Sequence, residues 1–297
     1  MSKKALCPVC FRQCELEDGQ FGPCLARVCR EGKVLADNYG KITALALDPI
    51  EKKPLYHFFP GSRILSLGSY GCNLFCPFCQ NCEISRAFEK EDQTLVFQKK
   101  EGDQYLIPFR KLSPEEARDL ALSLRDKGNI GIAFTYNEPL VGYEYVRDTA
   151  RLVKKAGMKT VLVTNGEASQ AVLDELLPYI DAMNIDLKAF RERTYREILG
   201  GDLKMLKNFI ERAAEVCHVE ITSLIVPGLN DRPQEVREMA KFIRSLKGGK
   251  GESICYHLSR YFPRYQMLDR PPTDPSLLYQ LKEEAEKELQ YVFLGNL

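Results

Sequence analysis

The feature that most constrains the fold is an alternation of short apolar runs with amphipathic helical stretches, which starts near Arg63 and continues through most of the chain. This alternation is typical of βαβ units on a parallel sheet. It predicts strands over residues 64–69, 130–136, 160–164, 182–187, 219–226 and 253–258. It predicts helices over residues 114–126, 144–156, 170–177, 203–216, 233–246 and 275–289. Six strands joined by helical crossovers favour an α/β fold of the open, partial (β/α)6 barrel type over a closed eight-stranded barrel.

Two regions depart from this alternation. Residues 1–60 contain five cysteines and little helical periodicity, so we expect a small Cys-rich, metal-binding module there that ends in a linker near residues 51–60. The barrel then occupies residues 61–297. Within the barrel, residues 85–112 predict a hairpin insertion, with strands over 94–98 and 104–109 around a turn that contains glycine.

The charge and hydropathy of the chain limit its partners and its location. The formal net charge is +1 and the pI is near 7.4, so no overall basic field favours nucleic acid or anionic lipid. No apolar run approaches the roughly 18 residues that span a bilayer. The first residues also hold no apolar stretch of the kind that a signal peptide needs. We therefore expect a cytoplasmic protein without nucleic-acid or membrane partners.

The cysteines gather mainly at two places, which in a long chain without an export signal indicates metal binding rather than disulfides. One group is Cys72, Cys76 and Cys79, in a CxxxCxxC pattern directly after the first predicted strand. Three thiolates so close cannot complete a structural zinc site, but they suit a cubane [4Fe–4S] cluster with one open iron. A zinc site completed by Cys82 or by a distant residue is the alternative.

The other group is Cys7, Cys10, Cys14 and Cys24, near the N-terminus. Four cysteines within so short a span can form a complete tetrahedral zinc site or hold a second iron–sulfur cluster. A structural zinc staple and an auxiliary cluster that relays electrons are both consistent with this spacing. The isolated cysteines at 217 and 255 lie in apolar stretches and are expected to be structural.

Phe78 precedes the third cysteine of the first group, and the resulting CxxxCxΦC pattern resembles the signature of the radical S-adenosylmethionine (SAM) superfamily. The resemblance covers roughly residues 60–297. It implies a [4Fe–4S] cluster whose open iron chelates the amino and carboxylate groups of SAM, and an electron donor such as flavodoxin or ferredoxin. Reductive cleavage of SAM would give methionine and a 5′-deoxyadenosyl radical that abstracts hydrogen from a substrate. The protein's part is to bind, orient and exclude competing reactions.

Several later motifs fall at predicted strand ends, where barrel enzymes place their chemistry. Asn137 and Glu138 stand where many members of this superfamily have a GGE-type motif, although the glycines are missing here. The resemblance implies that these two residues hold the SAM amino group, because a carboxylate accepts hydrogen bonds from an ammonium group. An ordinary turn at the start of a helix is the alternative.

Residues 164–166 (TNG) and 186–188 (DLK) resemble the TNG and DxK motifs of pyruvate formate-lyase activating enzymes. This implies that Asn165, Asp186 and Lys188 line the SAM site together with Phe78, and that Lys188 pairs with the SAM carboxylate. A purely structural ion pair between Asp186 and Lys188 is the alternative. His257, at the end of the sixth predicted strand, resembles a histidine near the SAM ribose in these enzymes.

A closer resemblance is to the radical SAM component of the AmmeMemoRadiSam system, a relative of these activating enzymes. It rests on the four N-terminal cysteines and on residues 48–55, 71–81, 135–139, 184–188, 225–231 and 291–296. It implies association with Memo-like and AMMECR1-like proteins. The expected function is SAM-dependent hydrogen abstraction from a protein or peptide. Radical modification of a small molecule and a non-enzymatic zinc-binding scaffold are the alternatives.

Overall fold

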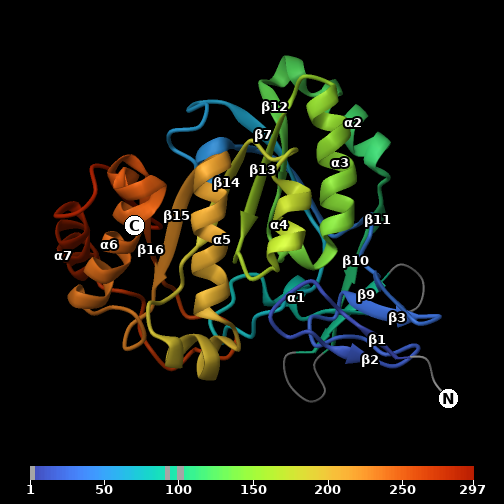
Figure 1. Ribbon diagram of the computed structural model, residues 1–297, viewed down its shortest axis with the longest axis horizontal. Helices are drawn as coiled ribbons and strands as arrows, with labels where there is room; N and C mark the ends of the chain where they lie inside the picture. Colours follow the sequence, from blue (N-terminus) through green and yellow to red (C-terminus); the bar gives the residue numbers. More distant parts are fainter. Residues whose placement is uncertain (1–3, 91–93, 99–103) are drawn as a thin grey trace.

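The computed structural model describes residues 4–90, 94–98 and 104–297, and it is built around an eight-stranded sheet (Figure 1). From one edge to the other, the strands are β17 (Val292–Gly295), β16 (Tyr256–Arg260), β15 (His218–Ile225), β14 (Ala182–Asp186), β13 (Lys159–Thr164), β12 (Asn129–Phe134), β7 (Arg63–Gly68) and β6 (Ala44–Pro49). Adjacent strands are parallel, except that β6 is antiparallel to β7. The mostly parallel sheet confirms the predicted α/β class.

The six strands expected from the sequence are present as β7 and β12 to β16. The last of them begins at Tyr256 rather than at residue 253, because Gly251–Ser253 form a turn of 3-10 helix, η5, before it. The edge strands β6 and β17 are additions that the sequence analysis does not predict. Strand β6 lies inside the range assigned to the N-terminal module, so the central sheet extends into that range.

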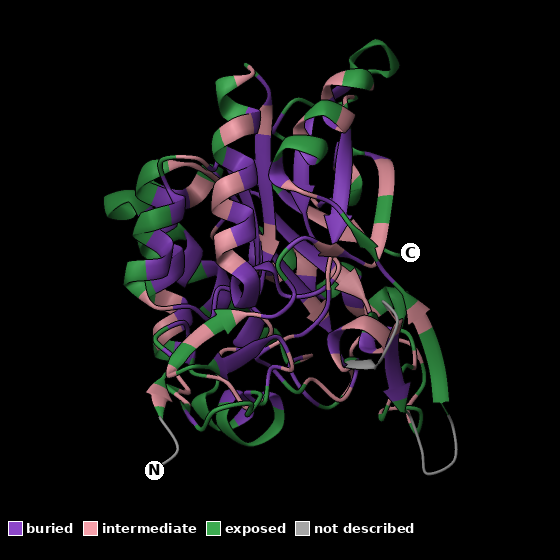
Figure 2. Ribbon diagram, turned by 90° about the vertical axis from the view of Figure 1, so that its right-hand side faces the viewer, coloured by how far each residue is buried: buried purple, intermediate pink, exposed green. Residues whose placement is uncertain are grey.

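Helices connect the strands and form an outer layer: α2 (Pro114–Ser123), α3 (Tyr143–Lys155), α4 (Gln170–Leu176), α5 (Leu203–Val216), α6 (Pro233–Gly249) and α7 (Pro275–Glu286). Each helix contacts the next in this order. Figure 2 shows that the strands are buried while the outer helix faces are exposed. Helix α2 starts with a capping box, in which Ser113 and Glu116 each accept a hydrogen bond from the other's backbone N–H.

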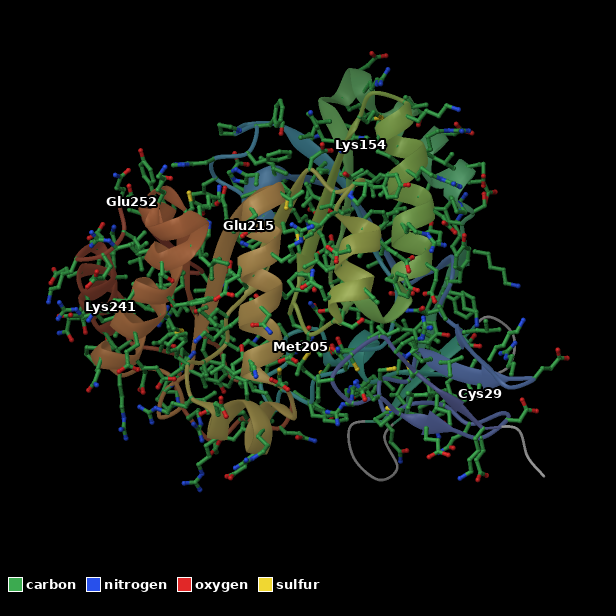
Figure 3. The ribbon with its side chains drawn as sticks, in the orientation of Figure 1. Cys29, Lys154, Met205, Glu215, Lys241 and Glu252 are labelled. Carbon is green, nitrogen blue, oxygen red and sulfur yellow. The ribbon has the colours of Figure 1, made fainter. Side chains whose placement is uncertain are left out.

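The starts of the helices lie on the same side of the molecule as the N-terminal module. Figure 3 shows Cys29 of the module and Met205 of α5 toward one end of the molecule, whereas Glu215 of α5 and Lys154 of α3 lie toward the other. Each such helix runs antiparallel to the parallel strands that it connects. The carboxyl ends of the strands, where the predicted site residues lie, therefore face the module.

The N-terminal module consists of two short antiparallel pairs. β1 (Ala5–Leu6) pairs with β2 (Glu15–Leu16), and β3 (Arg27–Arg30) pairs with β4 (Lys33–Ala36). A further short strand, β5 (Lys41–Ile42), pairs with β11 (Arg110–Lys111), which lies at the end of the predicted insertion. The module is thereby attached to the barrel through the region around the insertion.

The insertion forms a small antiparallel sheet in the order β10 (Gln104–Pro108), β9 (Thr94–Gln98) and β8 (Phe88–Lys90). This confirms the two predicted hairpin strands and adds β8. The predicted glycine-containing turn between them falls at residues 99–103, outside the described residues. The short helix α1 (Cys82–Ser85) precedes the insertion and contacts both β9 and β10.

The segment predicted as a linker packs into the base of the barrel. It begins with a turn of 3-10 helix, η1 (Ile50–Lys52), and the side chains of Ile50, Leu55 and Phe58 are buried in a cluster with Ile64 of β7 and Ala133 of β12. Burying aliphatic and aromatic side chains of this size stabilises a fold by about 1.5–3 kcal/mol each. Residues 50–58 are therefore held against the barrel.

Candidate functional site

A cavity of about 270 Å³ opens at the carboxyl ends of the strands. Nine of the predicted site residues line it: Cys72, Cys76, Phe78, Cys79, Asn137, Glu138, Asn165, Asp186 and Lys188. The lining also includes residues that the sequence analysis does not single out: Leu74, Gln80, Asn81, Ser85, Tyr136, Thr222, Leu224, Ser259 and Asn296. The convergence of the motif residues follows from the parallel sheet, because consecutive strand ends meet at one edge.

The loop that carries the three cysteines follows β7 and is held from several directions. The Phe75 N–H donates to the carbonyl of Leu199, 2.8 Å away, at the end of the π-helical turn η4 (Thr194–Leu199). The Arg86 guanidinium donates to the Cys72 carbonyl. The Cys79 N–H donates to the Cys76 carbonyl over 3.2 Å. These contacts fix the loop backbone, so the spacing of the cysteines is set by the fold.

The three cysteines form an electrostatically coupled group. Burial raises the pKa of Cys76 to about 12, while the nearby Lys188 charge acts to lower it. Burial also raises the pKa of Cys72, and thiolates at Cys76 and Cys79 raise it further. Such thiols remain protonated unless a cation compensates the thiolate charges, and this is what an iron–sulfur cluster does. The donor set therefore fits a cluster.

The cysteine side chains lie near one another but are not arranged as metal ligands in this structure. Within residues 4–90, 94–98 and 104–297, no group of three or more His, Cys, Asp and Glu side chains is already positioned to hold a metal ion. Cluster or zinc binding at either cysteine group therefore requires side-chain adjustment from this arrangement.

Glu138 lines the cavity and also fastens the ends of two strands together. Its carboxylate accepts hydrogen bonds from the Thr164 hydroxyl at 2.6 Å, the Asn165 N–H at 2.7 Å and the Leu140 N–H at 3.0 Å. Burial raises the pKa of Glu138 to about 7, although these hydrogen bonds act in the opposite direction. The bond to Leu140 caps the short helix η3 (Pro139–Gly142), so the helix-start alternative describes part of its role.

Asn137 is similarly engaged by the protein itself. Its amide nitrogen donates to the carbonyls of Tyr70 at 3.0 Å and Gly71 at 3.2 Å, and its amide oxygen accepts the Ser69 N–H at 2.9 Å. These bonds hold the start of the cysteine loop. The preceding residue, Tyr136, has φ = +74°, a left-handed conformation that is rare for an aromatic residue. No sequence signal indicates this turn.

Asp186 and Lys188 form the ion pair that the sequence alternative describes, with Lys188 Nζ 2.8 Å from Asp186 Oδ2. The pair borders the cysteine cavity. Burial alone would lower the pKa of Lys188, but the charges of Asp186 and Cys76 outweigh it and raise the pKa above its usual value. Lys188 therefore stays charged, which suits a carboxylate in the cavity.

His257 lines a neighbouring cavity, which shares Tyr136, Ser259 and Asn296 with the cysteine cavity. Its Nε2 atom is 2.6 Å from the buried carboxylate of Glu220 on β15. Burial alone would raise the pKa of Glu220, but hydrogen bonds from His218 and His257 and from two backbone N–H groups hold it well below its usual value. The ionised carboxylate of Glu220 thus fixes the position of the His257 ring.

The N-terminal cysteines are brought together and lie against the cysteine loop. The Cys7 N–H donates to the Cys14 carbonyl over 2.9 Å. Burial raises the pKa values of Cys10 and Cys14, and the charges of Cys7 and Cys24 raise them further. For Cys10, burial is the largest cause, and it raises the pKa to about 11. The four thiols are the donor type that zinc and iron–sulfur clusters take, but their side chains are not arranged as metal ligands in this structure.

A hydrogen-bonded path connects the two cysteine groups through Asn73. The Asn73 side chain hydrogen bonds to Cys10, and its Oδ1 atom accepts from the Asn165 amide at 2.9 Å. The same Asn165 amide lies 3.6 Å from the sulfur of Cys72. Arg12 reinforces the contact, because its Nε atom donates to the Asn73 carbonyl at 3.1 Å. The sequence analysis does not identify Asn73 or Arg12.

A protein-family model matches more than half of the chain and shows its family. The model described as the Radical SAM superfamily matches residues 67–243, a range that includes the whole cysteine loop and the motifs at the next three strand ends. The chain belongs to the radical SAM superfamily. The N-terminal cysteines lie outside the matched range.

Individual relatives agree with this assignment. The chain is 36% identical over 295 residues to the uncharacterized protein MJ0808 of Methanocaldococcus jannaschii, covering 99% of this chain and 81% of that protein. It is 26% identical over 202 residues to the pyruvate formate-lyase 1-activating enzyme of Escherichia coli K12, covering 67% of this chain and 75% of that enzyme.

Among solved structures, Streptococcus suis SuiB bound to its precursor peptide SuiA has a similar fold, with a TM-score of 0.54 and 15% identity. The match covers 76% of this chain and 46% of the SuiB chain, so this protein spans less than half of SuiB. At such identity the likeness concerns the fold alone.

The family assignment establishes the general chemistry. Radical SAM proteins are enzymes that use a [4Fe–4S] cluster and SAM, and they require a reductant. The chain is therefore an enzyme, which removes the scaffold alternative. In the part of the chain that the structure describes, no helix is long and apolar enough to cross a membrane.

Proposed function

We infer that this radical SAM enzyme cleaves SAM reductively and uses the 5′-deoxyadenosyl radical to abstract a hydrogen atom from a residue of a protein or peptide. The observation that carries the proposal is the single cavity that gathers Cys72, Cys76 and Cys79 with Asp186 and Lys188. A [4Fe–4S] cluster bound by these cysteines supplies the electron for cleavage.

The side chains of the cavity bind and orient SAM in this proposal. Lys188 pairs with the SAM carboxylate in a charge-assisted contact. Asp186 positions Lys188 for this contact through its ion pair with the Lys188 ammonium group. Glu138 and Asn137 border the SAM amino group while their hydrogen bonds keep the strand ends rigid. The Phe78 ring is buried and closes one wall of the cavity against water.

A protein or peptide substrate is supported by the likeness to pyruvate formate-lyase activating enzymes, whose names describe action on another protein. Radical modification of a small molecule is the second candidate. It is favoured by one observation, a polar cavity of about 560 Å³ that adjoins the cysteine cavity. Uncoupled SAM cleavage that accelerates with a partner protein would support the first candidate, and acceleration with a metabolite would support the second.

The four N-terminal cysteines and the motifs at residues 48–55, 71–81, 135–139, 184–188, 225–231 and 291–296 support a finer assignment. We infer that the chain is the radical SAM component of the AmmeMemoRadiSam system, with Memo-like and AMMECR1-like partners and flavodoxin or ferredoxin as the electron donor. Co-purification of the tagged chain with such proteins, compared with a tagged control enzyme of the same superfamily, tests the association.

The central test uses anaerobically reconstituted protein. The wild type should bind one SAM-responsive [4Fe–4S] cluster at the barrel and form 5′-deoxyadenosine when reductant is added. The triple variant C72A/C76A/C79A should lose both, whereas Cys217→Ser, which changes a cysteine outside the cavity, should retain them. A cluster spectrum that still responds to SAM in the triple variant would refute the proposal.

A further inference from the structure

A second cavity beside the proposed SAM site is lined by Asp48 of β6, by the segment that follows β6 and by residues at the ends of β16 and β17. Its volume is about 560 Å³, and Tyr136, Ser259 and Asn296 line both this cavity and the cysteine cavity. A molecule in the larger cavity would therefore lie directly beside SAM.

Two lysines share one carboxylate in its wall. Lys53 Nζ is 2.8 Å from Asp48 Oδ2, and Lys52 Nζ is 3.6 Å from Asp48 Oδ1. The Lys53 side chain is only 3% exposed, and its ammonium group lies 4.6 Å from the centre of the Tyr136 ring. A buried ammonium group with a single carboxylate oxygen as its hydrogen-bond partner retains N–H groups for a further acceptor.

The acceptors of the cavity are already used by the protein. Asp48 Oδ2 also accepts from the hydroxyl groups of Ser66 at 3.0 Å and Tyr136 at 2.8 Å. Glu51, the other carboxylate in the wall, accepts from the Gly61 N–H at 2.7 Å. The carboxylates of Asp48 and Glu51 are thus already hydrogen bonded to protein donors. They offer few free acceptor positions to a ligand that donates hydrogen bonds.

Several hydrogen-bond donors in the cavity wall are free to bind a ligand. Among the described residues, the structure gives the side chains of Ser259 and Asn296 no hydrogen-bond partner. Lys52 is 68% exposed, so its ammonium group can move without losing a buried contact. Hydroxyl, amide and ammonium groups facing one space together recognise an anionic oxygen group.

We propose that this cavity binds the carboxylate or phosphate group of the substrate, through Lys52, Lys53, Ser259 and Asn296. The proposal rests on the function inferred above, because it makes the cavity the anchor that holds the substrate beside SAM. The anionic group is held by the two lysines, and the rest of the substrate extends past Tyr136 toward the cysteine cavity.

The test measures binding of two probes to the reconstituted enzyme by calorimetry, at constant ionic strength and without reductant. The probes are inorganic phosphate and succinate, with putrescine as a cationic control. We expect phosphate, succinate or both to bind, and Lys52→Ala and Ser259→Ala each to weaken binding about tenfold, the order of one charge-assisted contact. Lys127→Ala, an exposed lysine outside the cavity, should leave it unchanged.

Asp48→Asn gives a prediction of opposite sign. Removing the carboxylate leaves both lysines without their shared counter-charge, so oxyanion binding should become tighter than in the wild type.

Binding of phosphate alone identifies a phosphorylated substrate, and binding of succinate alone identifies a carboxylate. If neither anion binds, if putrescine binds better, or if Lys52→Ala and Ser259→Ala act no more strongly than Lys127→Ala, the proposal is wrong. Because no SAM cleavage is measured, this failure is distinct from failure of the proposed function.

Discussion

Gly71 of the cysteine loop lies so close to Cys24 of the N-terminal module that a Cβ atom at position 71 would stand 2.7 Å from the Cys24 carbonyl oxygen. The same carbonyl accepts the Cys72 N–H over 3.1 Å. The two cysteine groups are therefore joined by backbone contact, and the absence of a side chain at Gly71 makes this contact possible.

Gly71→Ala should separate the module from the cysteine loop, because the added Cβ would also lie 2.6 Å from the Cβ of Ala26. Gly128→Ala is the matched control. Both glycines are left-handed, with φ = +88° and +82°, but nothing lies within 4 Å of a Cβ at residue 128. We expect the free energy of unfolding to fall by about 1–3 kcal/mol more for Gly71→Ala, the cost of overpacking. Urea denaturation measures the difference, and equal losses would contradict the contact argument.

Asn73→Ala should destabilise the same junction through lost hydrogen bonds. The buried Asn73 side chain donates to the Glu167 carbonyl at 2.7 Å and accepts from Asn165 at 2.9 Å. Leaving these partners unsatisfied costs about 1–3 kcal/mol, whereas Asn208→Ala on an exposed face of α5 should change little. Hydrogen exchange should quicken in the cysteine loop of Asn73→Ala. Unchanged exchange in that loop would show that Asn73 does not hold it.

The strands of the barrel could be predicted because strands buried on both faces appear as continuous apolar runs. Strand β6 could not, because it is an only partly buried edge strand within the range assigned to the Cys-rich module. Its antiparallel pairing with β7 depends on tertiary structure rather than on a local pattern.

The same division holds for the site. Asn165, Asp186 and Lys188 could be predicted because each follows a strand end, and parallel strand ends converge. The hydrogen bond between His257 and Glu220 could not, because it depends on how two neighbouring strands are aligned. The left-handed backbone at Tyr136 also could not be predicted, because glycine and asparagine are the residues that usually adopt that conformation.

Asp48 should make stability depend on pH in the acid range. Burial alone would raise its pKa, but hydrogen bonds from Lys53, Tyr136 and Ser66 lower it from 3.8 to about 2. A lowered pKa in the folded state stabilises the protein above the unfolded pKa, and this stabilisation is lost as the pH falls from about 4 to about 2. The shift corresponds to about 2 kcal/mol.

Asp48→Asn should therefore lower the free energy of unfolding most at neutral pH, and the difference from the wild type should narrow as the pH approaches about 2, where Asp48 is itself protonated. Asp126→Asn, an exposed carboxylate in the 3-10 turn after α2, should show no such trend. Urea denaturation across this pH range provides the measurement. A difference that stays constant with pH would mean that the pKa of Asp48 is not lowered in the folded protein.

We expect the N-terminal cysteines to bind a metal, and its identity would distinguish a structural role of the module from electron transfer. A second four-iron cluster would bring the wild type to about eight irons, whereas a zinc staple would give one zinc and about four irons. Metal analysis of anaerobically prepared wild type distinguishes the two. The turns at Pro8, Gly19, Gly22 and Pro23 suit a small zinc site, so we expect stoichiometric zinc with a single cluster.

Cys14→Ser should then release the module without abolishing the barrel. Metal binding and folding are coupled in a unit this small, so hydrogen exchange should quicken throughout residues 4–42. The loosening should extend to the Cys72 N–H, whose acceptor is the Cys24 carbonyl. The three barrel cysteines remain, so SAM cleavage should persist. Cys217→Ser is the control, because it changes a cysteine far from the module. It should leave exchange in residues 4–42 unchanged. If Cys14→Ser abolished SAM cleavage while the barrel cluster remained fully assembled, the staple would be excluded and an electron relay through the module would be the better account.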